Sequence, residues 1–170
     1  MASGTERPLT ASVISDADAF EIAQPDPSKA NGSSIAFLAE HDGRGLLLAG
    51  DAHPEVLCAS LDRLAAERGV ERIRIHAFKV SHHGGKHNLS SDLLDRVECG
   101  RWLFSTSGQI FGHPDAESVA RIVVRKSDCE LVFNYRSEEN ERWDSGRLRR
   151  KFRYRGAWPE PETAGMRVDV

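Results

Sequence analysis

The order of apolar runs and amphipathic segments constrains the fold of this chain more than any other feature. Two apolar runs, Ser33–Glu40 and Gly45–Ala49, flank a short turn that contains glycine, which predicts a β-hairpin. The second run is apolar throughout and predicts a strand covered on both faces. A helix is expected from Pro54 to Arg68, because proline suits a first turn and Gly69 suits a helix end. Apolar residues recur along this helix at i, i+4, i+7 and i+8: Leu57, Leu61, Leu64 and Ala65.

Strands and helices continue to alternate further along the chain. The remaining expected elements are, in order, strand Ile73–Val80, a helix near Ser90–Val97, strand Trp102–Ser105, helix Pro114–Lys126 and strand Leu131–Tyr135. Such alternation predicts an α/β domain, with a mixed sheet and flanking helices. The two longer helices should pack on the same sheet, because their apolar stripes need a common core.

The length of 170 residues suits one domain with a substantial core. We expect a flexible N-terminus over 1–8, a domain over 9–156 that starts with a strand at Leu9–Ser15, and a flexible tail over 157–170. A hydrophobic content of 39% with 29% charged residues argues against wholesale disorder. The sequence has no apolar run of about 18 residues and no signal-peptide pattern, so we expect a soluble, cytoplasmic protein without membrane contact.

The segment Arg142–Arg155 combines basic and aromatic residues and has two interpretations. One is a nucleic-acid contact. The other, which we favour, is an edge strand in which Phe152 and Tyr154 face the core while charged neighbours face water.

The three cysteines are Cys58, Cys99 and Cys129, each within an apolar stretch. Their odd number and wide spacing favour buried thiols over a disulfide framework or a cysteine metal site.

Three loops that follow expected strands carry the residues best suited to chemistry. They are Gly50-Asp51-Ala52-His53, Ser81-His82-His83-Gly84-Gly85-Lys86-His87 and Ser105–Pro114. An α/β sheet usually builds its site from such loops. We therefore expect Asp51, His82, His83 and His113 to converge at one end of the sheet.

Each loop also admits a purely structural interpretation. Asp51 is either an anion at a helix N-terminus or an oxygen ligand for a divalent metal. His82 and His83 precede two glycines that allow a close backbone approach, and they are either site residues or surface histidines in a turn. His113 precedes a proline and therefore favours an extended backbone, whether its ring serves a site or the residue only begins a helix.

Taken together, four motifs resemble the C-terminal half of the metallo-β-lactamase superfamily. They are Asn31-Gly32-Ser33-Ser34-Ile35, Leu48-Ala49-Gly50-Asp51, Lys79-Val80-Ser81-His82-His83-Gly84-Gly85 and Gly112-His113-Pro114. The branch that they resemble most includes the metallo domain of the DNA-uptake competence protein and related phosphodiesterases. The resemblance covers about residues 9–135 and implies half of an αββα sandwich with metals at the sheet edge.

The resemblance also implies a role for each candidate residue. Asp51 would be the carboxylate that bridges two metals. One of His82 and His83 would be the last histidine ligand, with His83 favoured and His82 left to face the substrate. His113 would line the pocket and either hold a phosphate or supply a proton to a leaving group. The candidate catalytic residues are thus Asp51, His82 and His113, and the candidate metal ligands are Asp51 and His83.

The His-x-His-x-Asp-His motif of the family's first half is absent from the 170 residues. Asp51 and one histidine supply two ligands, whereas a hydrolytic metal site generally has three or four. We therefore expect half of a metal-dependent hydrolase that acts on a phosphodiester or similar ester. A companion chain or segment with the first half of the fold, or a homo-oligomer, would complete it. Zinc is the expected metal and manganese the second choice. The alternative is a non-catalytic binding or assembly module that keeps the half-fold.

Overall fold

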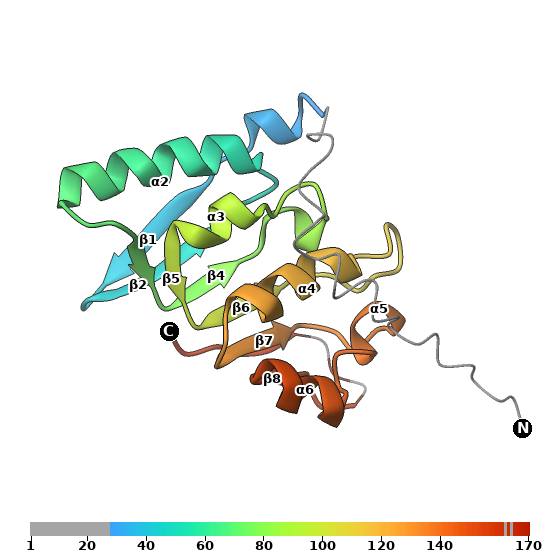
Figure 1. Ribbon diagram of the computed structural model, residues 1–170. Helices are drawn as coiled ribbons and strands as arrows, with labels where there is room; N and C mark the ends of the chain where they lie inside the picture. Colours follow the sequence, from blue (N-terminus) through green and yellow to red (C-terminus); the bar gives the residue numbers. More distant parts are fainter. Residues whose placement is uncertain (1–27, 162, 164) are drawn as a thin grey trace, which may run out of the picture.

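A mixed sheet of six strands organises the computed structural model, in which residues 28–161, 163 and 165–170 are described (Figure 1). The strand order is β1-β2-β4-β6-β7-β8. The strands span Phe37–His41 (β1), Arg44–Leu48 (β2), Ala77–Lys79 (β4), Arg101–Phe104 (β6), Cys129–Phe133 (β7) and Tyr154–Ala157 (β8). β1 runs antiparallel to β2, and the other neighbouring pairs are parallel. The predicted fold class, an α/β domain with a mixed sheet and flanking helices, is confirmed.

Five α-helices and a small second sheet complete the described part of the fold. The helices are α2 (Pro54–Arg68), α3 (Ser91–Asp95), α4 (Ala116–Arg125), α5 (Glu138–Glu141) and α6 (Gly146–Phe152), and two 3-10 turns are η1 (Asn31–Ser33) and η2 (Ser81–Gly84). β3 (Ile73–Ile75) pairs in parallel with β5 (Val97–Cys99). Within the described residues, no helix is both long and apolar enough to cross a membrane.

One face of the large sheet meets the helices and forms the core. A row of partners in register crosses this face: Leu47, Phe78, Trp102 and Leu131. None of these four side chains is more than 4% exposed, and they share one cluster with buried residues of α2, α3, α4 and α6. Fully burying one such side chain contributes about 1.5–3 kcal/mol. The prediction that α2 and α4 pack on one sheet is therefore confirmed.

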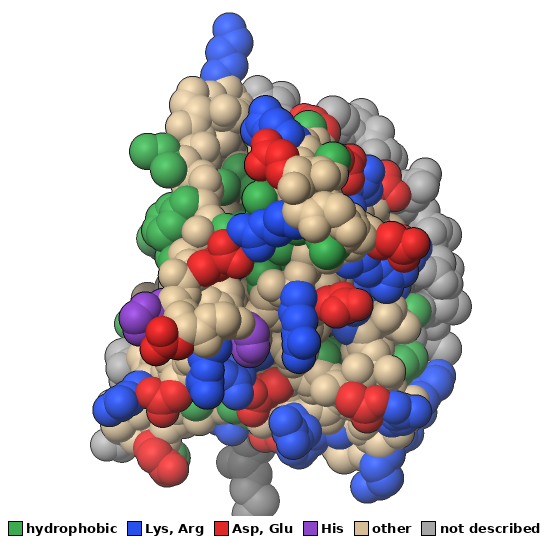
Figure 2. Space-filling model, turned by 90° about the vertical axis from the view of Figure 1, so that its left-hand side faces the viewer, with side chains coloured by type: hydrophobic (Ala, Val, Ile, Leu, Met, Phe, Trp, Pro, Cys, Tyr) green, Lys and Arg blue, Asp and Glu red, His purple; other side chains and the backbone are tan. Residues whose placement is uncertain are grey.

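The opposite face of the sheet carries a second row of residues in register across the strands. The apolar residues of this row lie outside the core cluster. The row runs in register through Phe37, Leu48, Lys79, Leu103, Val132 and Ala157. Val132 is buried, Leu48, Leu103 and Ala157 are half-buried, and Phe37 is 53% exposed. Figure 2 looks at the β1 side of the molecule and shows hydrophobic side chains projecting along one margin. We call this row, with the exposed Ile35 beside it, the outer face.

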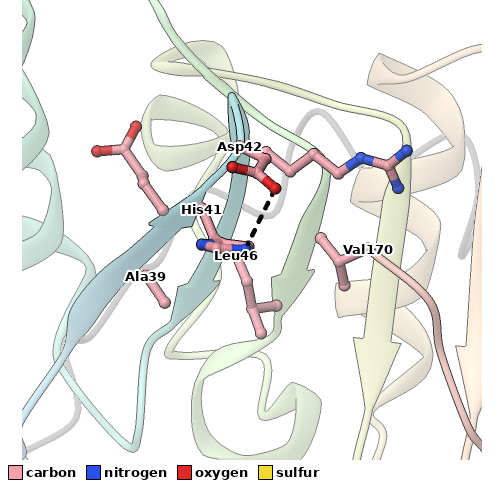
Figure 3. A pocket seen from close by; sticks show the side chains of 7 residues that line it. Ala39, His41, Asp42, Leu46 and Val170 are labelled. Atoms are coloured by element: carbon pink, nitrogen blue, oxygen red, sulfur yellow. Dashed lines mark ion pairs between the residues drawn. The ribbon is translucent and has the colours of Figure 1, made fainter.

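The C-terminal segment 165–170 extends from the end of β7 towards β2. Gly165 donates its N–H to the carbonyl of Asn134 at 2.8 Å, and Arg101 Nη1 donates to the carbonyl of Asp169 at 2.7 Å. Val170 then lines an open cavity of about 530 Å³ beside Ala39 and Leu46 (Figure 3). The flexible tail expected over 157–170 begins within β8, and its last six residues make contacts that include these.

The expected strand Ile73–Val80 is wrong as one element, because it divides into β3 and β4, which belong to different sheets. His76 separates them. Its backbone N–H donates to the carbonyl of Gly45 at 2.7 Å, while its ring Nδ1 lies 3.1 Å from the Gly45 nitrogen. The expected strand Ser33–Glu40 is also too long, because η1 includes Ser33 and β1 begins only at Phe37.

The basic segment Arg142–Arg155 contains a helix that the edge-strand interpretation missed. Ser145 caps α6 by accepting the N–H of Leu148 at 3.4 Å, and Arg153 ends it with a φ of 54°. β8 follows as the last strand of the sheet, and Tyr154 is buried as expected. Phe152 packs against the core from the end of the helix. The expected strand Leu9–Ser15 lies outside the described residues.

Candidate functional site

The loops after β2 and β4 are joined by backbone and hydroxyl contacts. The N–H of His82 donates to the carbonyl of Gly50 at 2.9 Å, and the buried Ser81 hydroxyl donates to the carbonyl of Ala52 at 2.7 Å. The N–H of Asp51 in turn donates to the Ser34 hydroxyl at 3.2 Å. These contacts place the Asp51 loop beside the histidine pair, at the carboxyl ends of adjacent parallel strands.

The His82–Gly84 turn has an unusual backbone that brings it against the loop after β6. His82, His83 and Gly84 all have positive φ values, of 45°, 58° and 89°. A Cβ atom on Gly84 would lie 2.8 Å from the Cβ of Pro114 and 3.0 Å from the ring of Phe104. Glycine suits this position, because the φ value and the narrow space both disfavour a side chain. The two loops are also bonded, since the N–H of Asp115 donates to the carbonyl of Gly84 at 3.0 Å.

Three imidazole rings gather where the loops meet. The ring centroids of His82 and His113 are 5.4 Å apart in an edge arrangement, and those of His82 and His83 are 6.3 Å apart. Asn88 contributes an amide that donates to the carbonyl of Asp51 at 3.5 Å. The structure thus brings the three predicted histidines together and bonds the loop of Asp51 to them. We call these rings the histidine cluster.

The hydrogen-bond partners of two histidines define which ring nitrogen carries hydrogen. His83 Nδ1 lies 2.5 Å from the carbonyl oxygen of Ser105, which only accepts, so Nδ1 carries a hydrogen and the lone pair of the neutral ring is on Nε2. His82 Nδ1 lies 2.9 Å from Asn88 Oδ1 and 3.4 Å from the amide nitrogen of Asn31. The shorter contact, to an acceptor, favours the same Nδ1–H form for His82.

An acidic residue adjoins the cluster and a lysine lies near Asp51, and the sequence analysis singled out neither. Burial alone would raise the pKa of Asp115, but the nearby His113 and the N–H of Lys86 outweigh burial and hold that pKa below its usual value. Burial lowers the pKa of the Lys79 ammonium, and the charge of Asp51 opposes part of that lowering. Lys79 therefore lies close enough to Asp51 for the two charges to interact.

His53 occupies a position related to that of His113. Each precedes a proline and an acid at the start of a helix, and in each pair the histidine Nδ1 is 3.6 Å from the carboxylate, Glu55 or Asp115. Gly32 packs on the His53 ring, where an added Cβ would lie 3.3 Å from Cε1. The repeated His-Pro-acid pattern was the sequence signal that would have identified Asp115.

A resident metal does not fit the described residues alone. Within residues 28–161, 163 and 165–170, no group of three or more His, Cys, Asp or Glu side chains is placed to hold an ion. Asp51 and His83, the predicted ligands, supply two donors at most, fewer than hydrolytic sites use. Two open cavities adjoin Arg44 at the amino end of β2, whereas the histidine cluster lies beyond its carboxyl end.

No family model matches this chain, and neither a curated protein nor a solved structure matches it. The family resemblance therefore rests on the sequence motifs, and the chemistry rests on the geometry of the loops.

Proposed function

We propose that this chain forms one side of a hydrolytic site of the metallo-β-lactamase type, which acts on phosphodiesters or similar esters. Asp51 and His83 are the two ligands that it offers, to zinc in the first place and manganese in the second. His82 and His113 face the substrate. The remaining ligands come from a companion polypeptide segment or from a second copy, because the described residues alone do not complete a metal site.

The observation that carries this proposal is the contact between His83 and Ser105. Histidines that bind metals almost always donate their other ring N–H to a carbonyl, a carboxylate or a water, which fixes the tautomer and the ring orientation. The Nδ1–H of His83 points to the Ser105 carbonyl at 2.5 Å, so its Nε2 lone pair is directed away from the backbone of that loop. The hydrogen bond from His83 Nδ1 to the Ser105 carbonyl is of the kind that orients a histidine whose Nε2 binds a metal.

The other two rings suit a phosphoryl group. Hydrolysis of a phosphodiester forms a bond from a water oxygen to phosphorus, with loss of a water proton to the solvent. It breaks one ester P–O bond and leaves an alkoxide that takes up a proton. His113, 5.4 Å from His82 between ring centroids, is the residue that we assign to donate this proton. His82 is held by Asn88 through Nδ1, and in its doubly protonated form it donates its Nε2–H to a phosphoryl oxygen.

The outer face is the surface that we assign to the completing segment. Phe37 is 53% exposed and Ile35 is 83% exposed, and apolar side chains grouped on a surface favour association. Lys79 lies in the same row and its charge interacts with that of Asp51, so the outer face adjoins the candidate ligand Asp51. A segment that packs on this face would therefore reach the site.

A second function class is favoured by one specific finding. The described residues hold no group of three potential metal ligands. A non-catalytic binding or assembly module would not need such a group. In that case the histidine cluster is a structural junction between loops and the outer face is the functional surface.

Hydrolysis of bis(p-nitrophenyl) phosphate distinguishes the two functions. We expect no appreciable hydrolysis by the chain alone, with zinc or manganese added. We expect metal-dependent hydrolysis by the chain together with its companion, lost in Asp51→Ala and His83→Ala and kept in His87→Ala, whose exposed side chain is in the same loop. Equal hydrolysis by all the complexes would overturn the proposal. A stable complex without hydrolysis would favour the assembly module.

A further inference from the structure

The pair formed by His113 and Asp115 is built differently from an ordinary surface ion pair. Nδ1 of His113 is buried and has no hydrogen-bond partner within the described residues, yet Oδ1 of Asp115 lies only 3.6 Å away. A buried ring nitrogen without a partner is costly. The Asp115 carboxylate is the acceptor that a small movement would bring into hydrogen-bond range.

Asp115 is itself held in place from two sides. Its second carboxylate oxygen, Oδ2, accepts the backbone N–H of Lys86 at 2.7 Å, and its own N–H donates to the carbonyl of Gly84 at 3.0 Å. Both partners belong to the loop that carries His82 and His83. The carboxylate is therefore fixed by the histidine loop while it faces the ring of His113.

We propose that Asp115 is a positioning residue that holds His113 in the Nδ1–H form and so keeps the Nε2 lone pair available to the histidine cluster. Catalytic hydrogen bonds are often long in a free protein and shorten when the substrate binds. The distance of 3.6 Å is consistent with such a contact before closure. The lowered pKa of Asp115 supports the assignment, because it keeps the carboxylate ionised and able to accept.

The charged surroundings agree with this role. His82 borders the His113 ring, with centroids 5.4 Å apart. Lys86 and Arg121 both interact with the Asp115 carboxylate, and Glu117 lies 3.9 Å from the Lys86 ammonium. The two cations favour the ionised carboxylate that the pair requires.

The chemical consequence rests on the proposed function. A neutral His113 with a free Nε2 takes up a proton there from the solvent, and the resulting imidazolium donates it to the leaving oxygen of the ester, which returns His113 to its neutral form. Asp115 does not touch the substrate in this scheme. It stabilises the imidazolium and sets the direction of the ring.

The test is the ring tautomer of His113, measured by nitrogen-15 NMR on the full chain without metal or substrate. We expect the Nδ1–H tautomer in the unsubstituted protein. In Asp115→Asn, the single side-chain oxygen should remain on the Lys86 N–H, which turns the amide NH₂ towards His113. A donor facing Nδ1 favours the Nε2–H tautomer of His113. We therefore expect Nε2–H to become the major tautomer in Asp115→Asn, while the contact of residue 115 with the Lys86 N–H remains.

Glu55→Gln is the matched control, because Glu55 and His53 have the same sequence pattern and the same 3.6 Å separation. It should leave the His113 tautomer unchanged. The Nε2–H tautomer in the unsubstituted protein, or the same tautomer with Asp and Asn at 115, would overturn the proposal. Finding the Nε2–H tautomer in the unsubstituted protein would overturn the proposal even if Asp115→Asn does not fold. The proposed hydrolytic function is tested separately by the hydrolysis of bis(p-nitrophenyl) phosphate, because the tautomer is measured without substrate.

Discussion

His83 Nδ1 lies 2.5 Å from the carbonyl oxygen of Ser105, so the end of β6 fixes the ring of a residue that follows β4. The positive φ of 58° at His83 directs the side chain to this acceptor. Two neighbouring parallel strands therefore determine one tautomer. The Nε2 lone pair that results is the most specific chemical feature of the site.

Replacing His83 by alanine should weaken the residual zinc affinity of the isolated chain. Losing even an outer partner of a ligand typically costs 10–100-fold, so we expect a loss of about tenfold or more. The measurement is titration calorimetry with Zn²⁺. His87→Ala, an exposed histidine of the same loop, should bind zinc as the unsubstituted chain does. Equal affinities for both variants would remove His83 from the ligand set.

Gly84→Ala should destabilise the protein by about 1–3 kcal/mol, because the new Cβ would meet Pro114 at 2.8 Å in a backbone with a φ of 89°. Urea unfolding gives the change in the free energy of unfolding. Gly100→Ala is the control, since a Cβ there has no neighbour within 4 Å. It should change stability by no more than about 0.5 kcal/mol. A tolerated Gly84→Ala would contradict the close approach of the two loops.

How far the sequence predicted the fold depends on how local each signal is. α2 was predicted with both ends correct, because Pro54 and Gly69 are local signals and Gly69 adopts a φ of 64°. The division of Ile73–Val80 was missed, since it depends on the contacts of His76 with Gly45, which are 31 residues apart. The helix α6 was missed because alternation of basic and aromatic residues also fits a strand.

The candidate site shows the same limit. The three histidine positions were predicted because each follows a strand, and strand ends of a parallel sheet meet at one edge. Asp115 was missed, because its role depends on the N–H of Lys86, 29 residues earlier. Lys79 was quoted only as part of a motif. Its interaction with Asp51 follows from the register of β2 and β4, which the sequence does not give.

Phe37→Asp should reduce association without reducing stability, because Phe37 is 53% exposed on the outer face. Sedimentation velocity measures the association, and urea unfolding the stability. Phe78→Ala is the contrasting change, since Phe78 is fully buried on the helix-covered face and its loss should cost about 3–5 kcal/mol. If Phe37→Asp leaves the sedimentation profile unchanged, the outer face is not the contact surface.

The cysteines should differ in reactivity. Burial raises the pKa of Cys99 to about 11 and that of Cys129 to about 12. Burial also raises the pKa of Cys58, but this thiol is only half-buried and is the most accessible of the three. Because the thiolate is the reactive form, iodoacetamide at about pH 8 should modify Cys58 first. Peptide mass spectrometry after timed alkylation locates the label. Equal labelling of all three in the folded protein would contradict the described core.

The most direct test of the account is the metal content and mass of the purified chain, measured together by elemental analysis and sedimentation equilibrium. Two ligands leave most of a coordination shell to water and cannot exclude competing metals. We therefore predict less than one zinc per chain after dialysis, no appreciable hydrolysis, and association with a second copy or a companion polypeptide. A strictly monomeric protein that retains two zinc ions per chain and hydrolyses a phosphodiester would contradict it.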